Sequence, residues 1–383
     1  MAGEVAYDRL DKSGLMRGIP ERGAILNSRS GRRVAVAALL LASAVAAPYA
    51  SSVQSRFDTR SAERFDEVRR LEGEALLSLA DEAMAGRGSS DFAIGWSNDF
   101  FKAQTGTFVP FTVTIERSAL TAADALMYVR ATRRDAVPDS RAIRYPFDVI
   151  FPVALSGPPG QPVRITRGFA VAPGDYDVYV ALRERAADPR SANRRLKSAV
   201  LKQPLTVPDF WRGELATSTI MIADRIDRVP APVVGEDVLE RPYVIGTNEI
   251  HRAAGTAFRQ DRELIVVFLI YNPSVSPDKS FDIEVDYHLF KKNTAGERVE
   301  SGDNQDHPPV QAGESYVTRT PPQRFKPAVM GANFDPASGP ILAGQGILLS
   351  SFKAGEYRLG ITVKDLMSRQ TLSRDVSFKV VGS

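Results

Sequence analysis

Apolar and polar residues alternate with a period of two along most of the chain after residue 90, and this period is typical of strands that bury one face. The pattern is most regular in residues 169–183 and 352–365. Each of these stretches contains a turn, then a glycine, an acidic residue and a tyrosine, and then apolar residues at every second position. The glycines are Gly174 and Gly355, and the tyrosines are Tyr176 and Tyr357. We interpret the two stretches as equivalent strands of two similar domains.

A tyrosine two residues after a glycine, at the start of such a strand, resembles the tyrosine corner of immunoglobulin-like domains, in which the tyrosine hydroxyl binds upstream backbone. The two motifs lie roughly 180 residues apart, which leaves room for a domain of ordinary size around each. The sequence therefore predicts an all-β fold of two tandem immunoglobulin-like β-sandwiches, at residues 91–208 and 210–383. In this interpretation the two glycines and the two tyrosines have structural roles.

Turn residues divide the first predicted domain into seven short strands, as a Greek-key sandwich requires. These strands are expected at residues 92–96, 108–115, 125–132, 147–153, 163–171, 176–183 and 199–207. In the second domain, residues 264–271 are all apolar, which predicts a strand that is buried on both faces. A helix or the other domain would have to cover its outer face. Other strands of this domain are expected at residues 215–222, 281–290 and 373–380, with proline-rich crossings at 228–242 and 320–340.

A leader is predicted at residues 1–53. Residues 34–47 form a run that is apolar except for Ser43, after Arg32 and Arg33 and with small residues near its end, as in a secretory signal peptide. Counting from Val34 to Val53 gives about 20 residues, which is enough for an uncleaved membrane anchor. Both alternatives predict a periplasmic or extracellular location, and the second adds a membrane tether. The paired arginines fit either the Sec or the Tat export route.

An amphipathic helix is predicted at residues 56–87, because apolar residues recur there at spacings of three and four. These residues are Phe65, Val68, Leu71, Ala75, Leu79 and Ala83. The helix could pack on the first domain or serve as a stalk, or it could pair with another helix as a coiled coil. We favour the first interpretation, because the apolar stripe is short and rich in alanine.

Composition excludes several kinds of site. The chain has 383 residues, a formal net charge of +3 and no cysteine, so disulfides, thiolate catalysis and zinc–cysteine sites are excluded. The positive charge comes from the leader, where seven Lys or Arg residues stand against four Asp or Glu residues before residue 47. The rest of the chain is therefore close to neutral and offers no basic stripe that would bind nucleic acid.

The two tryptophans are the candidate ligand contacts. Trp96 is followed closely by Asp99, and a tryptophan beside polar residues can stack on a sugar ring. The alternative is that Trp96 closes the core of the first sandwich, which is the commoner role of a tryptophan among apolar neighbours. Possible ligand contacts are therefore Trp96, Asp99 and Trp211.

Acidic residues alternate along residues 281–290, where Asp282, Glu284 and Asp286 share one face with His288. Side chains two apart in a strand lie about 7 Å apart, so this group could bind a hard cation. We favour the alternative that the acids face Lys or Arg on a neighbouring strand. A second group of the same kind consists of Asp303, Asp306 and His307. Neither group has the spacing of an established metal motif, so we predict no metal site, no cofactor and no catalytic residue.

Residues 99–104 (DFFKAQ) and 109–112 (VPFT), together with the pair Tyr271 and Asn272 after the apolar strand, carry a resemblance to known proteins. They are similar to β-sandwich regions of uncharacterised exported envelope proteins of the acidobacterial type, among them von Willebrand factor A-related proteins. This chain departs from that group, because no room for an A-type domain precedes residue 91 and the Asp-x-Ser-x-Ser metal motif is missing. The resemblance therefore implies an exported β-sandwich protein without metal-dependent adhesion.

The sequence thus predicts a non-catalytic module of the cell envelope that interacts with a protein or glycan partner. Two alternatives remain open. One is a carbohydrate-binding module that uses Trp96 and Trp211, and the other is a metal-assisted hydrolase on a β scaffold.

Overall fold

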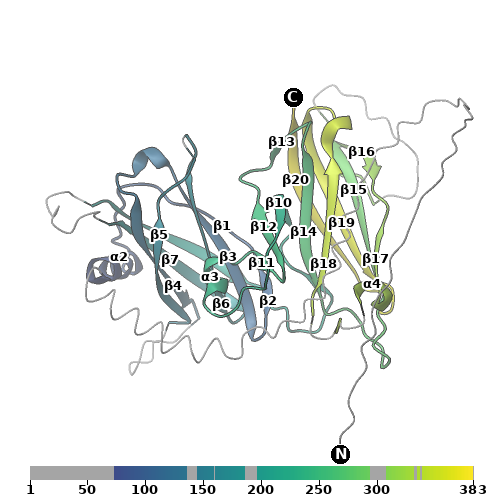
Figure 1. Ribbon diagram of the computed structural model, residues 1–383, viewed down its shortest axis with the longest axis horizontal. Coiled ribbons are helices and arrows are strands. Elements are labelled where there is room, and N and C mark those ends of the chain that lie inside the picture. Colours follow the sequence, from purple (N-terminus) through teal and green to yellow (C-terminus); the bar gives the residue numbers. More distant parts are fainter. Residues whose placement is uncertain are drawn as a thin grey trace, which may run out of the picture. The chain divides into compact units, whose positions relative to one another are not determined.

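A computed structural model describes residues 73–135, 145–158, 160–185, 196–293, 308–331, 334–336 and 339–382. Within these ranges the protein is mostly β-structure in four sheets, and every strand pairing except one is antiparallel (Figure 1). The predicted leader and the first part of the predicted amphipathic helix lie outside the described residues. None of the helices in the described part of the chain has the length and apolar character needed to cross a membrane.

The first sheet pair consists of a sheet in the order β1-β3-β2, in which β6 also pairs with β3, and a sheet in the order β5-β4-β7-β8. Its strands are β1 Gly95–Asn98, β2 Phe101–Ala103, β3 Gly106–Ile115, β4 Asp124–Arg133, β5 Phe147–Ala154, β6 Val163–Val171, β7 Gly174–Glu184 and β8 Ser198–Val207, with a 3-10 turn η2 at Arg117–Ala119. Alternate residues of both sheets, such as Phe111, Phe169 and Val180, pack into one apolar core. Each of the seven predicted strands overlaps one of these strands.

The second sheet pair consists of a sheet in the order β11-β12-β10-β14-β18, with β9 on β14, and a sheet in the order β13-β20-β19-β15-β16, with β17 on β15. Its strands are β9 Ala216–Thr217, β10 Met221–Arg228, β11 Val244–Ile245, β12 Asn248–Arg252, β13 Ala257–Arg259, β14 Glu263–Tyr271, β15 Ile283–Lys292, β16 Glu314–Arg319, β17 Gln323–Phe325, β18 Ile341–Leu348, β19 Gly355–Asp365 and β20 Thr371–Val381. Short helical segments are α3 Asp237–Glu240, α4 Pro327–Met330 and η3 Leu349–Ser351. A second apolar core lies between these two sheets and contains Phe268, Val285 and Leu359.

Both sheet pairs contain the same tyrosine device. The hydroxyl of Tyr176 donates to the backbone oxygen four residues upstream at 2.9 Å, and that of Tyr357 does the same at 2.7 Å. Both tyrosines are fully buried. The glycine two residues before each tyrosine has a positive φ, +140° at Gly174 and +155° at Gly355. Residues with a side chain rarely adopt this backbone conformation. The geometry is that of a tyrosine corner at the start of β7 and of β19.

β14 is buried on both faces, as its continuous apolar run predicts. Leu264, Val266 and Phe268 point into the core of the second sheet pair. The residues between them, including Val267 and Leu269, belong to a separate apolar cluster on the other face of the sheet. That cluster also contains Phe101 of β2, so the first sheet pair covers the outer face of β14.

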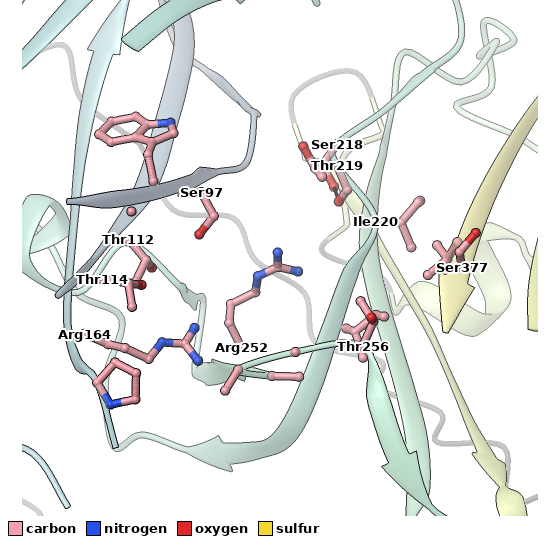
Figure 2. A pocket seen from close by; sticks show the side chains of 18 of the residues that line it. Ser97, Thr112, Thr114, Arg164, Ser218, Thr219, Ile220, Arg252, Thr256 and Ser377 are labelled. Carbon is pink, nitrogen blue, oxygen red and sulfur yellow. Dashed lines mark hydrogen bonds between the residues drawn. The ribbon is translucent and has the colours of Figure 1, made fainter. Parts of the chain in front are cut away.

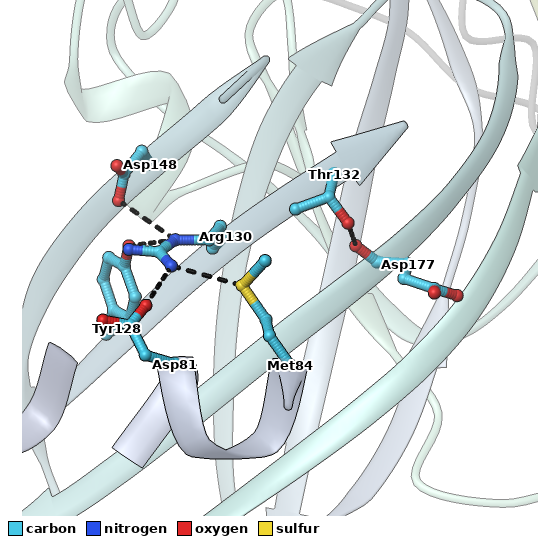
Figure 3. A network of polar contacts seen from close by, with 7 residues as sticks. All are labelled: Asp81, Met84, Tyr128, Arg130, Thr132, Asp148 and Asp177. Atoms are coloured by element: carbon cyan, nitrogen blue, oxygen red, sulfur yellow. Dashed lines mark hydrogen bonds and ion pairs between the residues drawn. The ribbon is translucent and has the colours of Figure 1, made fainter. Parts of the chain in front are cut away.

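The helix α2, at Glu74–Met84, packs on the outer face of the sheet β5-β4-β7-β8 through Leu76, Leu77 and Ala80. A guanidinium fixes its last turn, as Figure 3 shows. Arg130 of β4 is almost completely buried, donates to the Tyr128 hydroxyl and to the carboxylate of Asp81 on the helix, and lies 2.6 Å from that carboxylate. The described part of the predicted amphipathic helix therefore packs against β-structure.

The structure differs from the predicted pattern at residues 215–222, which form two short strands, β9 and β10, instead of one. The chain leaves the ladder at Ser218, where the side-chain oxygen accepts the amide hydrogen of Leu269 at 2.9 Å. A serine hydroxyl can replace a backbone partner in this way, and the replacement breaks the strand. The sequence of residues 215–222 contains no glycine or proline that would mark the break.

The proline-rich stretch at residues 228–242, predicted as an irregular crossing, contains some regular structure. β10 continues to Arg228, and α3 places Leu239 in the core of the first sheet pair. Residues 320–340, predicted as a second crossing, contain β17 and α4. β11, β12 and β13 were not predicted, because each has at most five residues and none shows a sustained alternation of its own. They are held by pairing with neighbouring strands: β11 with β12, β12 with β10, and β13 with β20.

Candidate functional site

An apolar cluster joins the two sheet pairs. It combines aromatic residues of the first sheet pair with the outer face of the sheet that contains β14. Phe101 meets Tyr243 edge to face, with ring centroids 6.1 Å apart. Aromatic pairs of this geometry add about 0.5–1.5 kcal/mol beyond the area that they bury. The contact between the sheet pairs is therefore packed like a protein interior.

A buried carboxylate lies beside this cluster. Asp99 is 1% exposed, and its Oδ2 accepts hydrogen bonds from the Tyr243 hydroxyl at 2.6 Å and from Arg252 Nε at 3.1 Å. Its other oxygen has no hydrogen-bond partner among the described residues. Burial raises the pKa of Asp99, while Arg252 and Tyr243 act in the opposite direction. Asp99, predicted as a ligand contact, thus lies where the two sheet pairs meet.

Direct hydrogen bonds also cross the junction. The amide of Phe100 donates to Thr219 Oγ1 at 2.9 Å, and the amide of Lys102 donates to the Tyr271 hydroxyl at 3.1 Å. The Lys102 ammonium binds Asn272 Oδ1 at 2.6 Å. Asn272 adopts a φ of +55° in the turn after β14, and its side chain reaches across the junction to Lys102. The Tyr-Asn pair noted in the sequence is therefore part of the junction.

Next to the junction, the two sheet pairs enclose a cleft with a volume of about 940 Å³ (Figure 2). One wall is the outer face of β1, β3 and β6, where Ser97, Thr112, Thr114 and Arg164 alternate with residues that point into the core. These positions are neighbours across the ladder, since Ser97 pairs with Thr112 and Thr114 pairs with Arg164. The wall is therefore a regular array of hydroxyl groups with one guanidinium.

The opposite wall comes from the second sheet pair. It includes residues 218–222 before and within β10, the segment 252–256 after β12, and residues 374–377 of β20. Figure 2 shows the side chain of Arg252 between the two walls, with Thr256 and Ser377 beyond it. A few apolar side chains, such as Ile220, complete this wall.

The charges in the cleft are predominantly positive. Its lining contains three arginines, Arg164, Arg252 and Arg374, and one carboxylate, Asp375. Asp375 is already paired with Arg358, whose Nη1 lies 2.8 Å away, and Arg252 is paired with Asp99. No ion pair within the described residues compensates Arg164 or Arg374. The cleft can therefore bind anions and hydroxyl-rich groups, and its described lining holds no histidine and no pair of carboxylates for acid–base chemistry.

The tryptophans predicted as ligand contacts lie in different places. Trp96 lies at the edge of the cleft, but its ring stacks on Phe111 at 4.6 Å and its Nε1 donates to Asn98. Trp211 is 51% exposed and does not line the cleft; the Lys102 ammonium lies 4.2 Å from its ring centroid. One face of each indole is thus occupied by a neighbouring side chain.

The acidic face of β15 is occupied by basic residues, which is the arrangement that we favoured. Lys364 on β19 lies 2.6 Å from Asp286 and 3.2 Å from Glu284. Asp282 pairs with Arg324 at 2.6 Å, and this pairing lowers its pKa. The described residues contain no group of three acidic or histidine side chains that could hold a metal ion. The second predicted group, Asp303, Asp306 and His307, lies outside the described residues.

Local patterns did not identify the residues that line the cleft. The outward positions of β3 are polar, and this signal was present in the sequence as Thr112 and Thr114. Arg164, Arg252 and Arg374, however, come from three segments that are far apart in the sequence. They share a cleft only because the junction places their strands side by side.

Comparison with known proteins finds structural similarity alone. No protein-family model matches the sequence, and no curated protein matches it. The chain has a distant structural similarity to β-rich domains of bacterial alpha-2-macroglobulins. A Salmonella alpha-2-macroglobulin reacted with methylamine is 12% identical, with a TM-score of 0.19 over 76% of this chain and 17% of that one. The native form of the E. coli protein is 9% identical, with a TM-score of 0.20 over 76% of this chain and 15% of that one.

The chain therefore spans less than a fifth of the length of these two proteins. The predicted resemblance to von Willebrand factor A-related envelope proteins stays a prediction.

Proposed function

We propose that this protein is a non-catalytic interaction module of the cell envelope, made of two immunoglobulin-like sandwiches at residues 91–208 and 210–383. Its partner, a glycan or a protein segment, binds in the cleft between them. The apolar run at residues 34–47 supports export, either as a signal peptide or, extended to Val53, as a membrane anchor. The polar cleft beside an ordered junction is the observation that carries the proposal.

The composition of the cleft supports binding rather than catalysis. Its walls present hydroxyl groups and guanidinium groups, which recognise a ligand through hydrogen bonds and charge. General acid–base catalysis needs paired groups that can exchange a proton near neutral pH, and the described lining offers none. A volume of about 940 Å³ suits an extended ligand of a few residues or sugar units.

The carbohydrate-binding alternative based on Trp96 and Trp211 has less support. Sugar stacking needs an exposed indole face. Phe111 covers one face of Trp96, and Lys102 lies over Trp211. The two rings also do not share a cavity, since only Trp96 borders the cleft.

The proposal is tested by capture from envelope extracts with the full chain in mild detergent. Filling the cleft with Thr114→Trp should abolish capture of a specific envelope component, because Thr114 lies on the cleft wall. The matched control is Thr206→Trp, at an exposed threonine of β8 that does not border the cleft, and it should capture normally. Equal capture by both variants, with both folded, would rule out the cleft as the binding site.

A further inference from the structure

We propose that the cleft binds an acidic saccharide, whose carboxylate groups contact Arg164 and Arg374 and whose hydroxyl groups contact the serine and threonine side chains of the walls. This inference rests on the proposed function and specifies its ligand.

The unpaired arginine side chains of the cleft favour a ligand with negative charges. Arg164 is exposed on β6, and its side chain has no hydrogen bond or ion pair within the described part of the chain. Arg374 is exposed on β20, and its side chain donates a hydrogen bond to the backbone oxygen of the neighbouring Ser373 at 2.9 Å. The two guanidinium groups belong to opposite walls. A guanidinium presents a planar pair of donors that fits a carboxylate, so a ligand with spaced carboxylates can bind both.

The other charged side chains of the cleft do not cancel the positive charge of Arg164 and Arg374. Arg358 lies 2.7 Å from Glu314 and 2.8 Å from Asp375, so its single positive charge offsets only part of the charge of the cleft carboxylate. In and behind the cleft, four arginines (Arg164, Arg252, Arg358 and Arg374) stand against three carboxylates (Asp99, Glu314 and Asp375), which leaves a net positive charge. Arg252 and Asp99 form a neutral pair at the base of the junction. Two arginines therefore remain for the ligand.

The hydroxyl groups define the rest of the ligand. Ser97, Thr114, Thr256 and Ser377 line the cleft, and none of these side chains has a hydrogen bond to another described residue. A hydroxyl both donates and accepts, so such an array can pair with sugar hydroxyls without leaving buried groups unsatisfied. Apolar side chains such as Ile220 and Val376 can pack against the C–H faces of sugar rings. A simple inorganic anion would use the arginines but not this array.

The size of the cleft favours a saccharide over a folded protein as the ligand. Ligand sites commonly have volumes of about 300–1,000 Å³, and this cleft, at about 940 Å³, falls in that range. A stable interface between folded proteins instead buries about 800 Å² on each partner, usually over a broader surface. An oligosaccharide of a few units fits the concave shape better.

The test is isothermal titration of the full chain in mild detergent with a tri-uronate oligosaccharide. We expect saturable binding that weakens with added salt, and at least tenfold weaker binding of the neutral trisaccharide of the same linkage. Arg164→Gln and Arg374→Gln should each reduce affinity for the uronate about tenfold, which corresponds to about 1.4 kcal/mol. Arg117→Gln, at an exposed arginine of η2 that does not border the cleft, is the matched control and should bind like the wild type.

Several outcomes would overturn the inference. Equal binding of acidic and neutral saccharides would do so, as would unchanged affinity in both arginine variants. Tighter binding of a polyphosphate than of the uronate would assign the cleft to phosphate. If cleft-dependent capture from extracts persists after enzymatic removal of glycans, the proposed function stands and the acidic saccharide is wrong. If neither capture nor titration depends on the cleft, both fail.

Discussion

β4 and β14 are central strands of their sheets, and both are buried on their two faces, but different structures cover them. The helix α2 covers the outer face of β4, where Leu126, Tyr128 and Arg130 point outward. The first sheet pair covers the outer face of β14. From Ile265 to Leu269 that face is entirely apolar, whereas the outer face of β4 includes a guanidinium.

The difference arises because α2 and the first sheet pair provide different partners for a polar side chain on the strand beneath them. A short helix ends beside the strand, so Arg130 reaches Asp81, whose side chain is 63% exposed and well hydrated. A junction between two sheet pairs has no such opening near its centre. The buried carboxylate of the junction, Asp99, is 1% exposed and has one oxygen unpartnered among the described residues. The polarity of an outward face therefore indicates what kind of element covers it.

The largest effect should come from placing a polar group in the junction. Leu269→Asn removes an apolar side chain from the cluster between the sheet pairs and buries an amide without a partner. We expect the free energy of unfolding to fall by about 3–5 kcal/mol. Denaturant unfolding followed by tryptophan fluorescence measures this loss.

The control for this prediction is Leu348→Asn on β18 of the same sheet, where the leucine is 39% exposed. Its effect should stay within about 0.5 kcal/mol, as is usual for surface substitutions. Similar losses in the two variants would mean that the junction does not bury the outer face of β14 in solution.

A smaller loss is expected when the polar contact beneath α2 is removed. Arg130→Ala deletes the bonds to Tyr128 and Asp81, and it leaves the Tyr128 hydroxyl buried. Because Asp81 is exposed and can hydrate, we expect a loss of about 2–3 kcal/mol in stability, below that for a fully buried pair. Hydrogen exchange of the amides in Glu74–Met84 should accelerate at the same time.

Arg133→Ala, on the same strand, tests whether the loss is specific. Arg133 pairs with Asp135 at 2.8 Å on the surface, where its side chain is 36% exposed. Its removal should cost less than about 1 kcal/mol and leave exchange in α2 unchanged. Unchanged exchange in the Arg130 variant would show that the apolar contacts alone hold the helix.

Local pattern predicted the regular part of this fold. Strict alternation located β7, β15 and β19, and the apolar run of β14 indicated that something covers it. Alternation could not reveal the break at Ser218, where the side-chain hydroxyl takes the place of a backbone oxygen as hydrogen-bond acceptor. It also could not reveal β12, which is short and carries charged residues. The cleft was out of reach for a different reason: Arg164 and Arg374 are about 210 residues apart, and only the junction relates them.

The two tyrosine corners should respond alike, because they share the same geometry despite their different surroundings. Tyr176→Phe and Tyr357→Phe each remove one hydrogen bond from a buried hydroxyl to a backbone oxygen and leave the ring packing intact. We expect each to lower stability by about 1 kcal/mol, with the two values equal within error. Thermal unfolding of the single variants measures both. A loss in one variant only would mean that the two sequence motifs are not equivalent in function.

The smallest effect concerns pH and distinguishes the buried carboxylate of the junction from a surface one. Burial raises the pKa of Asp99 in the folded chain above its ordinary value. Between about pH 4 and that raised pKa the folded state binds more protons than the unfolded state, so the contribution of Asp99 to stability falls as pH rises. The difference in free energy of unfolding between wild type and Asp99→Asn should therefore decrease with pH through this window and then level off.

Asp282→Asn provides a control of opposite sign. The hydrogen bonds from Arg324 lower the pKa of Asp282, so its contribution is present above the ordinary pKa and is lost as pH falls towards the lowered value. Denaturant unfolding of wild type and both variants across pH 3–8, which brackets the ordinary aspartate pKa of about 3.9, gives the two difference curves. If both curves rise with pH, Arg252 and the Tyr243 hydroxyl outweigh burial at Asp99, and the junction holds an ordinary ion pair. Opposite slopes would establish that the carboxylate between the sheet pairs is held in a drier environment than the one on the surface of β15.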